Sequence, residues 1–107
     1  MAKLERERVA ESMAHALARK DVDASTLNGL AWICATNNVH LEEALKAAER
    51  AAALEPKNAE ILDTLAEVHY RSGNAAKAIE VESQALSYSP NDQYLKDQIN
   101  RFKSGIK

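Results

Sequence analysis

Residues 59–90 read AEILDTLAEVHYRSGNAAKAIEVESQALSYSP, and this stretch decides the fold. It holds two segments in which apolar or small residues recur every three or four positions, the spacing of one face of an α-helix. Ser72-Gly73-Asn74 separates them and supplies a glycine for a positive φ and an asparagine for a helix N-cap. Pro90 follows the second segment, where it stops a helix. The stretch therefore predicts a helix–turn–helix unit.

The same unit occurs once more, earlier in the chain. Two pairs of segments match, at offsets of 35 and 34 residues: 27–35 with 62–70, and 44–51 with 78–85. Pro56 and Pro90 share the second offset, and the one-residue difference fits an insertion in the turn at Asn37-Asn38. A constant period near 34 residues indicates a helical repeat.

We expect a capping helix at each end of the two repeats, because two repeats bury little apolar surface and solenoids require capped ends. One face of residues 4–20 carries Val9, Met13, Ala16 and Leu17. After Asp92, an expected N-cap, a closing helix presents Leu95, Ile99 and Phe102. We expect Glu82 at the edge of this cap, within reach of a basic residue: Lys96, Arg101 or Lys103.

The sequence thus predicts helices only, at about 3–19, 24–36, 41–54, 59–71, 75–88 and 92–103. Alanines two turns apart indicate closely approaching helices. We expect them at the helix crossings: Ala31, Ala44, Ala51, Ala66, Ala78 and Ala85.

These residues resemble the tetratricopeptide repeat. The resemblance covers residues 24–92 and rests on Leu30, Ala31, Ala44, Ala51 and Pro56, then Leu65, Ala66, Gly73, Ala78, Ala85 and Pro90. It implies an all-α, right-handed α-α superhelix of antiparallel helix pairs. The chain then divides into an N-terminal helix (1–23), two repeats (24–58 and 59–92) and a capping helix (93–107), within a single domain of residues 1–107. Three residues stand where the family usually has an aromatic: Cys34, His69 and Glu82.

A second, local resemblance concerns the C-terminal half. The run Leu-Asp-Thr-Leu-Ala at 62–66 and Arg-Phe-Lys at 101–103 are similar to the C-terminal helical-repeat tails of bacterial thioredoxin-like multidomain proteins. This resemblance implies that the chain could be the regulatory tail of a larger enzyme.

Composition excludes several classes of function. The net charge is −2, with an acidic middle and mildly basic ends, so no overall positive field attracts nucleic acid. No stretch approaches the roughly 20 apolar residues of a membrane span. The first eight residues lack the apolar run of a signal peptide, which predicts a cytoplasmic protein if Met1 is the natural start.

We find no pattern that carries chemistry, and we expect no enzyme, cofactor or metal. His15, His40 and His69 lack metal-ligand spacing, and the single cysteine, Cys34, lies on an apolar stripe, where a buried thiol is inert. No nucleophile triad, phosphate loop or carboxylate pair is recognisable. Cys34 also excludes an internal disulfide, because it has no partner.

The family resemblance implies a protein-interaction module whose inner helices form a groove for a peptide or helix. The residues at positions that match the family's inner helices are the candidate groove residues: Asn28, Trp32, Glu60, Asp63 and Glu67. Trp32 either anchors a partner or packs against the helix near residues 9–17, and the acidic residues are either a solvated face or a binding surface. An acidic ligand would meet like charge there, so we expect a neutral or basic partner. Homodimerisation through exposed helix faces is the alternative.

Overall fold

The computed structural model describes residues 1–105, and every regular element in that range is an α-helix. There are six: α1 (Lys3–Ala18), α2 (Ala24–Thr36), α3 (Leu41–Leu54), α4 (Ala59–Arg71), α5 (Ala75–Tyr88) and α6 (Gln93–Ser104). The predicted all-α class and the predicted helices are confirmed, with ends that differ by at most one residue. The last two positions of the predicted segment 93–107 lie outside the described residues.

Side-chain caps fix most helix starts. The side chains of Asp23, Asn58, Asn74 and Asp92 each accept a hydrogen bond from a backbone N–H in the first turn of the following helix. Gly73, in the α4–α5 turn, takes the positive φ expected of it, +88°. The α2–α3 turn has no glycine, and Asn38 and His40 adopt φ values of +52° and +50° instead. Asparagine tolerates this left-handed conformation better than most residues.

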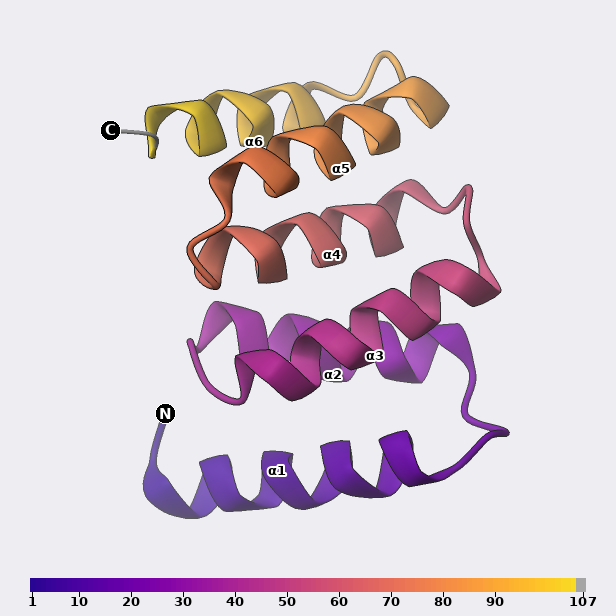
Figure 1. The fold of residues 1–107 in the computed structure, drawn as a ribbon, viewed down its shortest axis with the longest axis vertical. Coiled ribbons are helices and arrows are strands. Elements are labelled where there is room, and N and C mark those ends of the chain that lie inside the picture. Colours follow the sequence, from indigo (N-terminus) through magenta and orange to yellow (C-terminus); the bar gives the residue numbers. More distant parts are fainter. Residues whose placement is uncertain (106–107) are drawn as a thin grey trace.

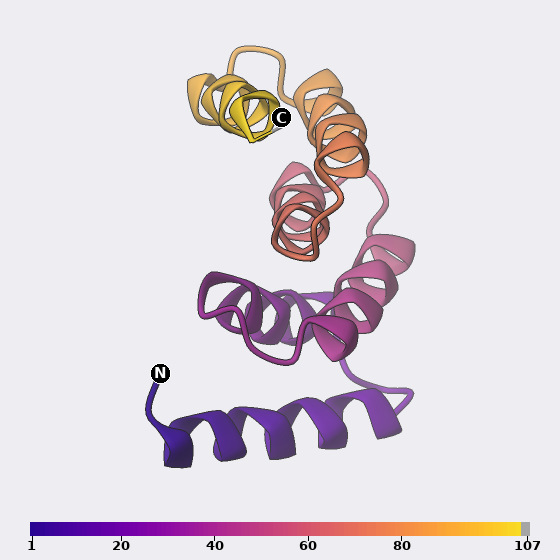
Figure 2. The same cartoon turned by 60° about the vertical axis from the view of Figure 1, so that its left-hand side comes forward.

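The helices stack into a curved array of 35 × 30 × 18 Å, in which consecutive helices run in opposite directions (Figure 1). Figure 2 shows α2, α4 and α6 along one side of the stack and α3 and α5 along the other. Side chains on α2, α4 and α6 therefore share one face, the inner face of the curve.

Small residues make this close stacking possible. The six alanines predicted at the crossings are all 0 % exposed: Ala31, Ala44, Ala51, Ala66, Ala78 and Ala85. The cap at the C-terminal end is also as predicted, since Leu95, Ile99 and Phe102 are all buried.

The N-terminal helix is held mainly at its C-terminal end. Its two buried residues are Met13 and Ala16, whereas residues 1–8 are all exposed. Arg50 of α3 donates hydrogen bonds to the carbonyls of Ala16 and Leu17, both at 3.3 Å, and to that of Arg19. These bonds satisfy carbonyls that a helix C-terminus leaves without a partner.

Candidate functional site

A pocket of about 250 Å³ opens on the inner face of the stack. Its lining comes from α2, α4 and α6: Asn28, Gly29, Trp32, Glu60, Asp63, Thr64 and Tyr94. Helical spacing explains the arrangement, because Asn28 and Trp32 lie one turn apart on α2, as do Glu60 and Thr64 on α4. Four of the five residues predicted to form the groove thus converge on one cavity.

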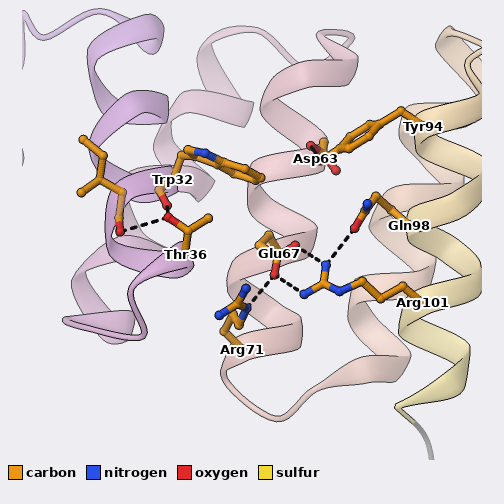
Figure 3. A network of polar contacts seen from close by, with 9 residues as sticks. Trp32, Thr36, Asp63, Glu67, Arg71, Tyr94, Gln98 and Arg101 are labelled. Atoms are coloured by element: carbon orange, nitrogen blue, oxygen red, sulfur yellow. Dashed lines mark hydrogen bonds and ion pairs between the residues drawn. The ribbon is translucent and has the colours of Figure 1, made fainter. Parts of the chain in front are cut away.

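Trp32 provides an aromatic wall of this pocket. Its indole extends from α2 toward α4 (Figure 3), and the residue is half-buried. It does not take the alternative position against the first helix. Glycine at the neighbouring position 29 leaves the space beside it open, since a Cβ there would meet nothing within 4 Å.

Glu67, the fifth predicted groove residue, does not line the pocket but forms an ion-pair network. It is 3 % exposed, and its two carboxylate oxygens accept bonds of 2.6 and 2.8 Å from Arg101 of α6. Arg71 adds a third bond of 2.7 Å, and Arg101 also donates to Gln98 (Figure 3). Burial raises the pKa of Glu67, but the two arginines outweigh that effect and hold it below its usual range. Glu67 is therefore ionised and joins α4 to α6.

The guanidinium of Arg101 also lies over an aromatic ring. Its central carbon is 4.9 Å from the ring centroid of Tyr70, and Tyr70 packs against Phe102 with centroids 4.8 Å apart. An arginine between a carboxylate and aromatic rings gains both charge pairing and a cation–π contact.

The prediction that Glu82 lies at the edge of the cap and pairs with a base is wrong. Glu82 is 0 % exposed, and within residues 1–105 no Lys or Arg forms an ion pair with it. Arg101 is engaged by Glu67, and Lys96 and Lys103 are exposed. Positions 78, 82 and 85 share the buried face of α5, so Glu82 faces α4 instead of solvent.

Glu82 meets the carboxyl group of Asp63 in this interior. Burial, together with the neighbouring Asp63, raises the pKa of Glu82 to about 10, so Glu82 is a neutral acid at pH 7. Asp63 Oδ1 and both oxygens of Glu82 are buried and have no hydrogen-bond partner within residues 1–105. Burial raises the pKa of Asp63 as well, and Glu82 and Tyr94 oppose that rise. We assign the proton of the pair to Glu82 and the negative charge to Asp63, because the pKa of Glu82 lies well above 7.

Asp63 connects this buried pair to the pocket. Its Oδ2 accepts a hydrogen bond of 3.2 Å from the hydroxyl of Tyr94. Burial, with the charge of Asp63, raises the pKa of Tyr94, so the phenol keeps its proton. Sequence reasoning did not find Tyr94, because it lies 31 residues from Asp63 on a helix regarded as a cap.

Other reactive groups are separate from the pocket. Cys34 is fully buried, and burial, with a smaller effect of Glu43, raises the pKa of its thiol to about 11. In residues 1–105, no three His, Cys, Asp or Glu side chains are grouped to hold a metal ion. None of the helices described is long and apolar enough to cross a membrane.

Comparison with protein families agrees with this architecture. The family model described as "Tetratricopeptide repeat" matches residues 40–97, more than half of the chain. The chain belongs to the tetratricopeptide repeat family. No curated protein and no solved structure matches it at a significant level.

Proposed function

We propose that this protein is a non-catalytic scaffold that binds a peptide or helix of a partner protein in its inner groove. Members of the tetratricopeptide repeat family generally mediate protein–protein interactions. The observation that carries the proposal is the pocket at Trp32, since it lies on the inner face and combines an exposed aromatic surface with polar groups. Such combinations dominate the binding energy of protein interfaces.

The charge of the groove favours a neutral or basic ligand. Glu60 and Asp63 line the pocket, and Asp63 forms no ion pair with any residue in the range 1–105. An incoming carboxylate would be repelled at short range, and a cation would be attracted. We therefore expect that acidic C-terminal tails do not bind here.

The test is a selection of random dodecapeptides displayed on phage against the full chain, followed by NMR mapping of the selected peptides. We expect shifts concentrated at the pocket residues of α2, α4 and α6. Weaker binding after Asp63→Lys, with the exposed Glu49→Lys as control, would locate the site. Peptides that shift only the convex helices α3 and α5, or a selection without binders, would contradict the proposal.

Homodimerisation is the second candidate, favoured by the outer surface of α1. Leu4 is 58 % exposed there, and a shallow hollow is lined by Glu11, Ala14, His15 and Ala18. Light scattering over a hundredfold range of concentration distinguishes the two. A dimer whose interface maps to α1 supports this candidate, and a constant monomer mass removes it.

A further inference from the structure

We infer that the pocket between Trp32, Asp63 and Tyr94 is a receptor for the guanidinium group of an arginine side chain of the partner. This inference rests on the proposed function and specifies which side chain the groove recognises. It follows from a comparison of two neighbouring carboxylates on α4.

The first carboxylate shows how this groove holds a guanidinium. Glu67 accepts two hydrogen bonds from the chain's own Arg101, whose planar group lies over the Tyr70 ring. The carboxylate comes from α4 and the arginine from α6, so this pair joins the two helices (Figure 3).

The second carboxylate also lies beside aromatic side chains, but within residues 1–105 it pairs with no cation. Asp63 lies one turn before Glu67 on the same face of α4, and Tyr94 and Trp32 supply aromatic surface beside it (Figure 3). Within residues 1–105, no arginine or lysine pairs with Asp63, although only 7 % of this residue is exposed. A pocket of about 250 Å³ lies where the cation would be.

Hydrogen-bond acceptors remain for such a group. A carboxylate offers about four lone-pair sites, and the hydrogen bond from Tyr94 uses one of those of Asp63. Across the pocket on α2, the buried Oδ1 of Asn28 receives no hydrogen bond from residues 1–105. A guanidinium has five donors in a plane, so it can reach both acceptors and stack on an indole, whereas an ammonium cannot stack.

Glu60 at the rim adds to the attraction for a cation. It is exposed and lines the same pocket. The acceptors, the aromatic walls and the charge therefore select the same chemical group.

The test uses the full chain and blocked amino acids, so it needs no identified partner. N-acetyl-arginine N-methylamide is titrated at constant ionic strength, followed by Trp32 fluorescence and by the NMR signals of Trp32 and Tyr94. The uncharged isostere N-acetyl-citrulline N-methylamide and the corresponding lysine amide are the controls. We expect saturable binding of the arginine amide, about tenfold weaker binding of citrulline, and intermediate binding of lysine.

A pair of variants locates the effect. Asp63→Asn keeps the shape and removes the charge, and we expect it to weaken arginine binding about tenfold. Glu49→Gln removes one exposed charge from α3, and we expect less than a twofold change. The inference would be overturned by any of three results: equal binding of the arginine and citrulline amides, binding of the lysine amide as tight as that of the arginine amide, or no saturation by the arginine amide. All three are measured on the unmodified chain, so they do not depend on whether a variant folds.

The outcomes separate the inference from the proposed function. Selected peptides that bind the inner face without an arginine overturn the inference and leave the proposed function standing. Binding of the arginine amide with no selected peptide supports the inference and contradicts the proposed function.

Discussion

Replacing Glu82 with glutamine is expected to stabilise the protein at pH 7. Glu82 is 0 % exposed and its pKa is raised to about 10, so folding at pH 7 requires it to take up a proton. In the unfolded chain the pKa of the same group lies near the ordinary glutamate value of 4.5. Glutamine has nearly the same shape and is neutral in both states, so its folding avoids this proton uptake.

The magnitude follows from the pH interval over which the folded and unfolded states differ in protonation. The interval between pH 4.5 and pH 7 corresponds to about 3 kcal/mol, because each pH unit is worth about 1.36 kcal/mol. Glutamine has a second N–H, and leaving it unpaired in the interior costs about 1–3 kcal/mol. We therefore expect Glu82→Gln to raise the free energy of unfolding at pH 7 by up to about 2 kcal/mol.

The pH dependence gives the sharper signature. A carboxyl group whose folded pKa is raised contributes stability below its unfolded pKa and loses it as the pH rises toward the folded value. The advantage of the variant should therefore grow with pH by up to about 1.4 kcal/mol per unit. It should vanish at about pH 6 and become a disadvantage of about 1–3 kcal/mol near pH 4, where only the cost of the unpaired N–H remains. The acidic neighbours Asp63, Glu67 and Asp92 remain in the variant and affect both proteins.

Urea unfolding at pH 4, 5, 6, 7 and 8, followed by circular dichroism, measures this difference. Glu49→Gln, an exposed change on α3, is the matched control and should change stability by less than about 0.5 kcal/mol at every pH. A Glu82→Gln protein that is less stable than the parent at pH 7, or a difference that does not vary with pH, would refute the reasoning.

Three further changes test the packing and the network. Ala78→Leu should lower the free energy of unfolding by about 1–3 kcal/mol in urea, through overpacking at a helix crossing; an unchanged midpoint would show that the crossing has spare room. A chain ending at Asn91 should melt lower or aggregate, whereas a chain ending at Gly105 keeps α6 and should behave as the parent; equal melting of both would contradict the role of α6 as a cap. Arg101→Gln should cost about 1–3 kcal/mol by leaving Glu67 with a single cation, and equal thermal stability would show that the network adds nothing.

The sequence was sufficient for the fold because its signals are local. Asn74 and Asp92 mark helix starts through their capping side chains, and both accept the expected backbone hydrogen bonds. Proline and glycine mark the turns, and the period of about 34 residues orders the helices. The caps and the turn residues depend only on neighbours within one or two turns, and the period is visible in the sequence itself.

The site was only partly predictable because it depends on contacts between distant helices. Asn28, Trp32, Glu60 and Asp63 were found from equivalent positions in the two repeats. Tyr94 was not, since its contact with Asp63 spans 31 residues. Glu82 was misplaced for a different reason: its position on the stripe of Ala78 and Ala85 indicated burial, but a carboxyl group is rarely buried without a partner.

The asymmetric attachment of α1 has a consequence for how the chain exchanges its amide hydrogens. Arg50 holds the C-terminal end of this helix, and its first turns have no buried side chain. Regions with few buried contacts open locally at a lower free energy than the whole protein. Deuterium should therefore enter α1 from its N-terminal end while α4, with eight consecutive buried residues, stays protected until global unfolding. The molecule then has a graded stability along its length, with its least protected helix at one end and its most protected helix beside the pocket.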